Sequence, residues 1–340
     1  MSLNNYIFNN GKRQLNKAAV MLVLIIMVIA AFVISLRTGK YPLTLKGILS
    51  GDTMQIKVLV RLRIPRAVMG VAGGFGLGIA GYVYQLVFKN PLASPDIVGV
   101  SSGASAGAAM AIVFISSVSS VVSAVAFAAA MLTLIVTLLI AYLVPGKNSY
   151  TIVLSGIAIH SLAQTILMFI KLAADPEKQL ASIEYWIMGS LNSVSVDDLL
   201  IPCIVTFIGT ILIIILYRQL LMLSLDEDEA ASLGVHIVLL RLIVLVIATL
   251  IVSVIICTTG LISFIGLLAP HIAGRLIKNH NISLLMLSGI SGSLLLTLAD
   301  ILARSVTSSE LPVSIFTSLL GAPLLIIENI STFQKLIIRI

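Results

Sequence analysis

Arginines gather in the stretch VRLRIPRAVMG, residues 60–70, where a polar stretch meets a long apolar segment. Arg61, Arg63 and Arg66 stand within six residues of one another. A guanidinium group carries its donors in a planar fork, so it can hold a carboxylate through two hydrogen bonds. Basic residues near the end of a membrane span can also anchor to lipid headgroups. The spacing therefore indicates an anion-binding surface, for acidic protein groups or for lipid.

The chain just before these arginines adds more positive charge. Arg37, Lys40, Lys46 and Lys57 precede them, and Asp52 is the only acid in this stretch. Seven bases minus one acid give residues 37–66 a net charge of +6.

A second charged stretch, SLDEDEAASLGVHIVLLR, interrupts the apolar runs at residues 224–241. Its acidic run, residues 226–229, falls in the first turn of a short predicted helix, where negative charge is favoured by the helix dipole. Gly234 is typical of a residue that ends a helix. Such a helix beside the membrane is either a solvated connector or a lever that a partner protein moves.

Chemistry of other kinds has few candidates in the sequence. Asp300 and Arg304 are four residues apart on a predicted helix, and we expect them to form a structural ion pair. A proton relay would need further ionisable partners in the spans. The P-loop pattern G-x-x-x-x-G-K-[ST] is missing, and the four scattered histidines predict no metal site. A transporter with neither a nucleotide site nor an ion-coupling site would need energy from a partner chain. We expect no cofactor.

The elements that must position these residues are membrane spans. The chain has 340 residues, of which 59% are hydrophobic and only 10% charged, and its mean hydropathy is +1.14. Soluble domains carry roughly 25% charged residues, so lipid is the predicted solvent. A helix needs about 20 apolar residues to cross a bilayer. The candidate spans, about ten in number, are residues 18–36, 66–88, 97–116, 119–144, 150–173, 197–217, 237–258, 261–277, 282–303 and 312–333.

These spans predict an all-α integral membrane protein. A membrane β-barrel would show strict alternation of apolar and polar residues, which the runs lack. The stretches GVAGGFGLGIAG and GVSSGASAGAA are dense in small residues, which let helices approach closely, so we expect both inside the bundle. Cys203 and Cys257 lie in apolar runs and predict buried side chains rather than a disulfide.

The distribution of charge leaves the orientation in the membrane open. With the N-terminus inside, eleven bases fall on the inner side and ten on the outer side. Without the +6 loop the count is eleven against three. The positive-inside rule therefore requires either the inverted topology or a special reason for that loop.

Three blocks of the sequence carry a resemblance to a known family. RIPRAVMGVAGGFGLGIAGYVYQLVFKNPLASPDIVGVSSGASAG, DEDEAASLGVHIVLLR, and the C-terminal set GLISFIGLLAPHIAGRLI, LADILAR and ELPVSIFTSLLGAPLLI occur in order. Together they resemble the FecCD family, the permeases of iron-siderophore and vitamin B12 type ABC importers. Where the family has G-P-I-G-F-V-G this chain reads GLISFIG, which puts the geometry of that bend in doubt at Leu261 and Ser263.

The resemblance implies a type II ABC importer permease fold, similar to the vitamin B12 permease, formed by one transmembrane domain over residues 1–340. It implies a cytoplasmic N-terminal tail, residues 1–17, and a cytoplasmic coupling segment at about residues 224–236. It also implies a multi-pass protein of the cell membrane, with the N-terminus inside and the +6 loop outside. The expected partners are two cytoplasmic ATPase subunits, an external substrate-binding protein, a second permease subunit in a homodimer or heterodimer, and the lipid bilayer, but no nucleic acid.

The same resemblance implies roles for individual residues. Docking of the binding protein is expected at Arg63, Arg66 and Arg304. A cytoplasmic gate is expected at Asn90, Leu92, Ser149 and Tyr150. Coupling to the ATPase is expected at Asp226, Glu227, Asp228, Glu229, Ala231, Leu233 and Gly234.

The function implied is ATP-driven import of an iron(III)-siderophore, with ATP hydrolysis in separate subunits, so that this chain is not itself an enzyme. Haem or cobalamin import is the alternative within the family. A secondary transporter or channel that works without partners is the alternative of another class.

Overall fold

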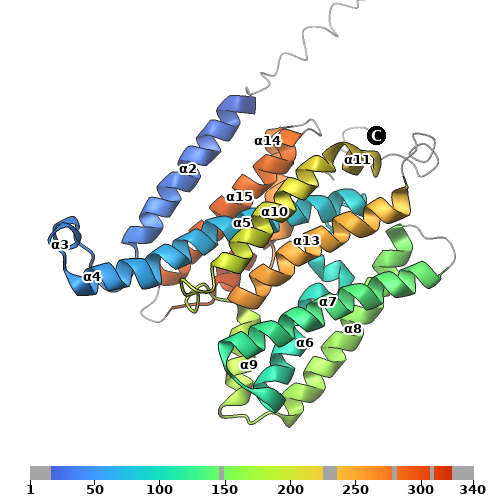
Figure 1. Ribbon diagram of the computed structural model, residues 1–340, viewed down its shortest axis with the longest axis horizontal. Helices are drawn as coiled ribbons and strands as arrows, with labels where there is room; N and C mark the ends of the chain where they lie inside the picture. Colours follow the sequence, from blue (N-terminus) through green and yellow to red (C-terminus); the bar gives the residue numbers. More distant parts are fainter. Residues whose placement is uncertain (1–16, 145–148, 225–235, 278–281, 307–309, 324–340) are drawn as a thin grey trace, which may run out of the picture.

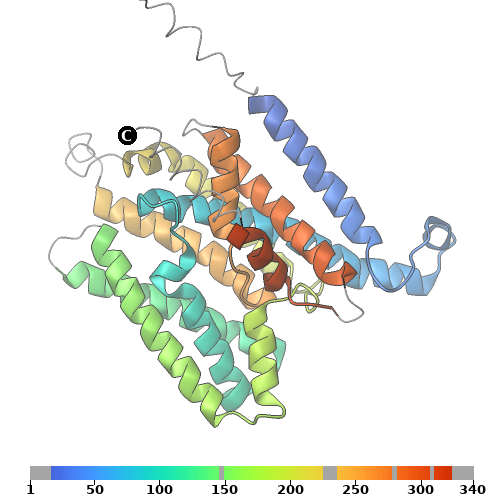
Figure 2. The same cartoon turned by 180° about the vertical axis from the view of Figure 1, so that it is seen from behind.

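The structure is a computed structural model that describes residues 17–144, 149–224, 236–277, 282–306 and 310–323 (Figures 1 and 2). Throughout these residues it consists of helices and the turns that join them. The helices are α2 (Lys17–Arg37), α3 (Leu45–Leu49), α4 (Thr53–Val58), η1 (Leu59–Arg63), α5 (Ile64–Val87), η2 (Pro95–Val98), α6 (Val100–Met110), η3 (Ala111–Ile115), α7 (Ser119–Leu143), α8 (Ser149–Ala173), α9 (Gln179–Met188), α10 (Leu200–Ile215), α11 (Tyr217–Met222), α13 (Ile237–Thr259), α14 (Ile265–Leu276), α15 (Ile282–Ser305) and a last helix, Val313–Pro323.

Each of the ten predicted spans overlaps a helix of the structure. The span predicted at residues 119–144, for example, is α7. Six helical runs are long and apolar enough to cross a membrane, judged by length and composition. Val100–Ile115, Leu200–Ile215 and Val313–Pro323 are shorter apolar helices. The all-α membrane architecture predicted from the sequence is confirmed.

The basic loop before α5 contains helical structure that hydropathy did not predict. The Thr44 hydroxyl accepts a hydrogen bond from Gly47 N at the start of α3, and Asp52 Oδ1 accepts one from Met54 N at the start of α4. Hydrogen bonds from Gln55 and Met54 hold the pKa of Asp52 below its ordinary value. From Thr53 the helical run continues through a π-helical turn, η1, into α5. Lys46, Lys57 and Arg61 therefore lie on short helical segments that project from the bundle (Figure 1).

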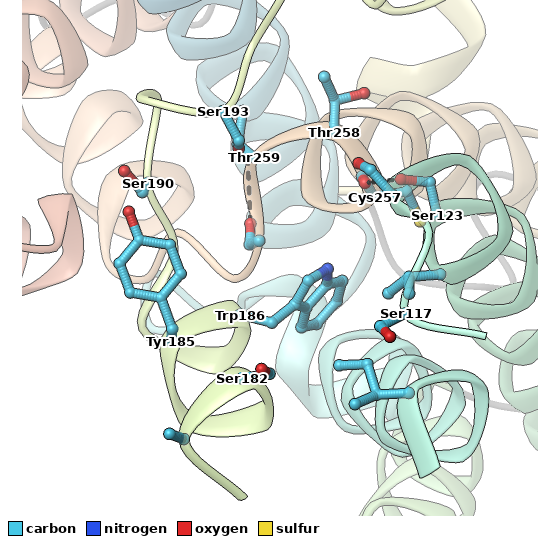
Figure 3. Close-up of a pocket in the computed structure, with 15 residues that line it drawn as sticks. Ser117, Ser123, Ser182, Tyr185, Trp186, Ser190, Ser193, Cys257, Thr258 and Thr259 are labelled. Carbon is cyan, nitrogen blue, oxygen red and sulfur yellow. Dashed lines mark hydrogen bonds between the residues drawn. The ribbon is translucent and has the colours of Figure 1, made fainter. Parts of the chain in front are cut away.

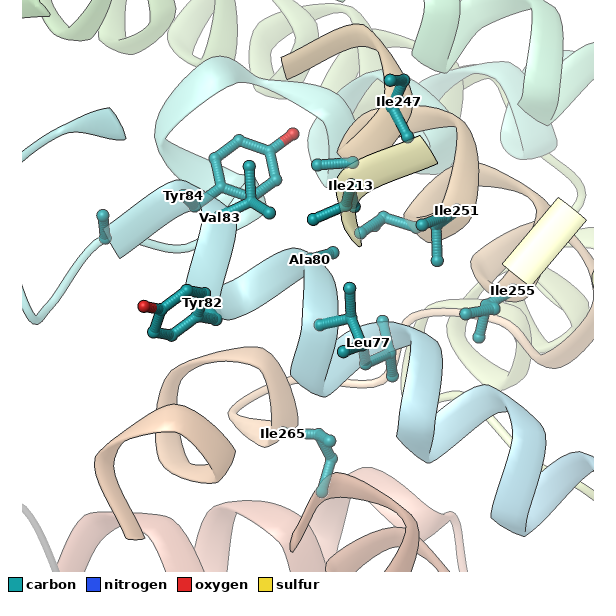
Figure 4. Close-up of a cluster of buried hydrophobic side chains, with 14 of the residues drawn as sticks. Leu77, Ala80, Tyr82, Val83, Tyr84, Ile213, Ile247, Ile251, Ile255 and Ile265 are labelled. Atoms are coloured by element: carbon teal, nitrogen blue, oxygen red, sulfur yellow. The ribbon is translucent and has the colours of Figure 1, made fainter. Parts of the chain in front are cut away.

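Helix α5 is the centre of the larger part of the bundle and packs on α10, α13, α14 and α15. Its glycines permit this closeness. A Cβ added at Gly74 would collide with the carbonyl of Gly292, and one at Gly78 with the carbonyl of Ser288, both on α15. Figure 4 shows the same helix on its other sides, where Leu77 lies near Ile255 of α13. The prediction that this small-residue stretch packs inside the bundle is confirmed, since 78% of its most apolar window is buried.

Helices α6, α7, α8 and α9 form a second group beside the first (Figures 1 and 2). The small residues of α6 are nearly all buried against α7 and α8. Trp186 of α9 packs against the apolar clusters of both groups. Helix α9 is a short surface helix, and at ten residues it is too short to have been found as a span.

Two bends place α6 and α14 within the bundle. Gly99 has φ +80° before α6, and Gly260 has φ +74° after α13. Phe264, with φ +67°, then begins α14 in the left-handed region that L side chains rarely adopt. In the GLISFIG bend the positive φ angles therefore fall on Gly260 and Phe264. Neither Leu261 nor Ser263, where the family pattern is lost, has to adopt one.

Candidate partner-docking and translocation sites

Four charged residues meet at one end of α5, called here the Arg66 end. Asp300 of α15 is buried there and uses both of its carboxylate oxygens. Oδ1 accepts a hydrogen bond from Arg66 Nε at 2.7 Å, and Oδ2 accepts one from Arg304 Nη2 at 2.7 Å. The spacing of four residues thus brings Asp300 and Arg304 together as predicted, but the sequence did not reveal that Arg66 shares the same carboxylate.

A second carboxylate completes this cluster from a neighbouring loop. Arg66 Nη1 donates to Glu310 Oε2 at 2.8 Å and to Asn192 Oδ1 at 3.2 Å. Arg66 Nη2 is buried and has no hydrogen-bond partner. We name Arg66, Asp300, Arg304 and Glu310 the arginine–carboxylate cluster. Its two cations and two anions balance, which is what a buried group of charges requires.

Arg63 and Arg304 also hold the end of α2. Arg63 donates to the carbonyls of Leu36, Arg37 and Tyr41, and Arg304 Nη1 donates to the carbonyls of Ser35 and Thr38. These carbonyls lie at or just after the last turn of α2, where a helix leaves acceptors unpaired and favours positive charge. The two arginines therefore fasten the first helix to the rest of the bundle.

The predicted docking residues are thus buried and engaged within the chain. Arg63, Arg66 and Arg304 are 5%, 5% and 8% exposed. The other five bases of the +6 loop have exposed side chains: Arg37, Lys40, Lys46, Lys57 and Arg61. Docking through the three buried arginines stays a prediction, and any carboxylate from outside would meet the exposed bases first.

The opposite end of α5, called the Asn90 end, carries two of the predicted gate residues. Asn90 Oδ1 accepts a hydrogen bond from Leu92 N at 2.9 Å, which closes a turn directly after α5. Leu92 is 56% exposed, and Asn90 lines a cavity of about 460 Å³ with Tyr82, Gln85 and residues of α14. Both side chains are therefore at the surface, where a constriction with another chain would need them.

The remaining predicted gate residues are Ser149 and Tyr150, at the start of α8. Tyr150, near the start of α8, is 67% exposed, and Ser149 is the first residue of that helix. The gate role of these residues stays a prediction. The predicted coupling residues, within 226–234, lie outside the described residues. The segment joins α11 to α13.

A further cavity, of about 420 Å³, lies at the Arg66 end between α9 and the neighbouring ends of α7 and α13 (Figure 3). Six serines and two threonines are among its fifteen lining residues, and Trp186 stands in it. Sequence reasoning missed this cavity because its hydroxyls come from four separate stretches of chain. It also missed Glu310 and Asn192, although an acid in a short loop between two spans was a usable signal.

Comparisons with known proteins agree with this architecture. Residues 24–329 match the model of the FecCD transport family. A solved metal-chelate type ABC transporter in an inward-facing conformation is similar with a TM-score of 0.82 and 32% sequence identity. The match covers 91% of this chain and 97% of that one.

Two curated relatives show how far the similarity extends. The molybdate import system permease protein MolB of Haemophilus influenzae is 31% identical over 311 residues, which are 88% of this chain and 92% of MolB. A Helicobacter pylori permease named for an iron chelatin transport system is 36% identical over 267 residues, 78% of this chain and 80% of its own. The long alignments with these relatives, the match to the family model over residues 24–329 and the all-α bundle agree with one another. They show that the chain is an ABC importer permease and belongs to the FecCD transport family.

Proposed function

We propose that this chain is the membrane subunit of an ATP-driven importer that carries an iron(III)-siderophore delivered by an external substrate-binding protein. The observation that carries the proposal is the match of almost the whole bundle to a metal-chelate type ABC transporter. The relatives are named for different cargoes, molybdate and iron chelatin, so family membership alone leaves the cargo open.

The proposed complex contains two cytoplasmic ATPase subunits and a second permease subunit. In it the Asn90 end faces the cytoplasm and the Arg66 end faces outward. The acidic segment at residues 224–236 lies between α11 and α13 and would meet the ATPase. Asn90, Leu92, Ser149 and Tyr150 would narrow the cytoplasmic mouth at the axis between the two permease subunits.

We assign docking of the binding protein to the Arg66 end. The five exposed bases of the +6 loop supply the positive field that attracts acidic lobes of a binding protein. Arg66 contributes from below this surface, because its Nη2 still has a hydrogen to donate. Arg63 and Arg304 hold the loop and the end of α2 in the shape that the partner meets.

The test is uptake by the reconstituted complex. Permease, ATPase and binding protein are placed in liposomes, and radioactive iron is supplied as a neutral ferric trihydroxamate. We expect uptake that needs ATP and the binding protein and continues when ion gradients are collapsed. Uptake that follows an ion gradient without ATP would indicate a secondary transporter instead. ATP-dependent uptake of haem or cobalamin by the same liposomes, without uptake of the ferric chelate, would assign the alternative cargo.

A further inference from the structure

The cavity at the Asn90 end has a basic wall. Lys89, His271 and Arg275 are among its thirteen lining residues, and none of the thirteen is Asp or Glu. The next acid along the chain after α5, Asp96, lies in η2 and outside the lining. The volume of about 460 Å³ falls in the range of small-molecule sites, roughly 300–1,000 Å³. An anion that enters this cavity meets positive charge from the ends of two helices.

The charged and the apolar lining residues of the cavity lie at different depths. Lys89 follows the end of α5, Arg275 is in the last turn of α14, and both are exposed. Leu86 and Tyr82 precede Lys89 on α5 by about one and two helical turns, and both are buried. The cavity therefore has a charged mouth and a largely apolar floor, an arrangement that suits an amphiphile with an anionic head.

Lys89 has a backbone conformation that is unusual for a lysine. Its φ is +49°, in the left-handed region. Lys89 N donates to the carbonyl of Leu86 at 3.2 Å, and Asn90 N donates to that of Gln85 at 3.1 Å. These two bonds form the Schellman motif that ends many helices, and glycine is the usual residue at the left-handed position. The turn therefore does not require a lysine, and such strained positions are concentrated at functional sites.

Gly274 leaves open space beside the bases of α14. It lines the cavity, and a Cβ added to it would have nothing within 4 Å. His271 lies about one turn before it on the helix, and Arg275 follows it directly. Neighbouring side chains therefore leave room for a ligand next to both of these residues.

Helix ends alone explain only part of this arrangement. Positive charge is favoured at the C-terminal end of a helix, which accounts for one base at the end of α5 and another at the end of α14. The helix dipole does not require that Lys89 and Arg275 line one cavity, or that the cavity lacks acids. An ammonium group has three N–H donors and a guanidinium five, so each can hold an anion in addition to an acceptor of the protein.

We propose that this cavity binds the phosphate group of an anionic phospholipid. In the orientation proposed above, the lipid belongs to the inner leaflet, which carries anionic lipids, and basic pockets between membrane helices bind such headgroups. The phosphate lies at the mouth, between Lys89 and Arg275. The cavity has room for the headgroup but not for the acyl chains as well, so the chains extend into the bilayer.

Lipid binding is measured on the full-length permease in detergent, by native mass spectrometry during titration with phosphatidylglycerol. We expect saturable binding about tenfold tighter than that of phosphatidylcholine, which has no net charge. Equal binding of the two lipids would overturn the inference. Glycerol phosphate has the anionic group without the chains and should not displace the lipid. Displacement by it would assign the cavity to a soluble anion and overturn the lipid.

The full chain is the appropriate protein for this measurement because it contains its own acids. The acidic run at residues 226–229 begins two positions after Ser224, which lines the cavity. The affinity obtained is therefore that of a lipid in competition with these carboxylates.

Two variants of one position test the cavity itself. Gly274→Glu and Gly274→Gln place side chains of the same size in the open space, and they differ only in charge. The glutamate should pair with the neighbouring bases and repel the phosphate. We expect phosphatidylglycerol to bind Gly274→Glu about tenfold more weakly than Gly274→Gln. Equal affinity in the two variants would overturn the inference.

A second pair of variants separates the cavity from the overall charge of the Asn90 end. Lys89→Gly removes a base and suits the left-handed backbone, so it should weaken phosphatidylglycerol by about fivefold or more without lowering the unfolding temperature. Arg218→Gln removes an exposed base of α11 outside the lining and should leave the affinity within about twofold. An equal loss in both variants would mean that the lipid responds only to total charge, which overturns the site.

A carboxylate of the ATPase is the competing occupant on the cytoplasmic side. Failure of Gly274→Glu to assemble with the ATPase, while its lipid affinity equals that of Gly274→Gln, would make the cavity a protein contact and overturn the lipid. None of these measurements requires transport. Failure of the proposed cargo in the uptake assay would therefore leave this inference standing, and loss of lipid binding would leave the importer standing.

Discussion

Arg66 Nε donates to Asp300 Oδ1 at 2.7 Å although 234 positions of the chain separate the two residues. This contact joins α5 to α15, and Arg304 binds the other oxygen of the same carboxylate. Both side chains of the pair are almost fully buried. The cluster is therefore a structural joint between the first and last parts of the bundle, beneath the surface that we assign to docking.

Asp300→Asn should destabilise the permease strongly. The substitution keeps the shape of the side chain but leaves two buried guanidinium groups with one carboxylate. Removing one member of a buried ion pair costs about 3–5 kcal/mol. Thermal unfolding of the purified variant measures this. Asp197→Asn, an exposed acid in the loop before α10, is the control and should unfold as the unmodified chain does.

Docking should depend on the exposed bases. Lys57→Glu together with Arg61→Glu should slow association of the binding protein and weaken it, because both side chains contribute to the positive surface. Affinity of the unmodified permease should also fall as salt rises, since exposed charges are screened over about 8–10 Å. The exchange Lys57→Arg with Arg61→Lys keeps the charge and serves as control. Equal affinity in all three proteins would assign the loop to lipid anchoring.

From the sequence alone, charge reversal at Arg63 and Arg66 would be the variant to choose for testing docking. In the structure, these substitutions test the stability of the fold instead. Glutamate at residue 66 would face Asp300 and Glu310 in a buried site, so the fold itself should suffer. We expect low yield and a lowered unfolding temperature for Arg66→Glu. Arg66→Lys keeps one charge but cannot reach all three acceptors, and it should fold while binding the partner more weakly. Normal stability of Arg66→Glu would contradict the buried cluster.

Coupling should depend on residues 224–236. Gly234→Pro would fix the backbone where the predicted helix ends, and it should stop stimulation of ATP hydrolysis by the loaded binding protein. Insertion and assembly should be retained. The measurement is ATPase activity of the purified complex with and without the binding protein. Full stimulation in this variant would place the coupling element elsewhere.

The cytoplasmic mouth should close between two copies of the chain. Single cysteines at Asn90 or Leu92, in a background without Cys203 and Cys257, should form disulfides between subunits in the nucleotide state that closes the path. Both positions are exposed at the Asn90 end. A cysteine at Leu162, exposed in the middle of α8, is the control. If neither position crosslinks in any nucleotide state, the gate lies elsewhere.

The contact between α5 and α15 should tolerate no side chain at Gly78. Gly78→Ala places a Cβ against the carbonyl of Ser288, so the helices must separate, and overpacking of this kind costs about 1–3 kcal/mol. Gly274→Ala on α14 is the matched control, because a Cβ there has nothing within 4 Å. In thermal unfolding, Gly78→Ala should therefore have a lower unfolding temperature than Gly274→Ala.

Hydropathy located the spans because the requirement for about 20 apolar residues is local. The span ends follow from the same rule, so α7 and α8 were placed to within a residue or two. Helix α9 was missed because it has ten residues and lies outside the long apolar runs.

The environment of the arginines could not be predicted from their own neighbourhood. Arg61 and Arg63 are two residues apart, yet the first is exposed and the second is buried against the end of α2. Which of them is buried depends on where Leu36 and Arg37 end a helix, and Arg66 depends on Asp300 and Glu310. These are tertiary contacts over 26 to 244 positions, which spacing along one helix does not report.

During synthesis of the chain, Arg66 is made long before Asp300, its partner in the arginine–carboxylate cluster. The ribosome makes Arg66 first and needs roughly 10–50 s to add the 234 positions that lead to Asp300, at about 5–20 residues per second. During that interval Arg66 has no carboxylate of the cluster and must stay near water or headgroups. The contact between α5 and α15 can therefore form only after α15 has been made. A truncated chain that ends before α15 would leave the Arg66 cation without Asp300 and Glu310, the two carboxylates that balance it in the complete bundle.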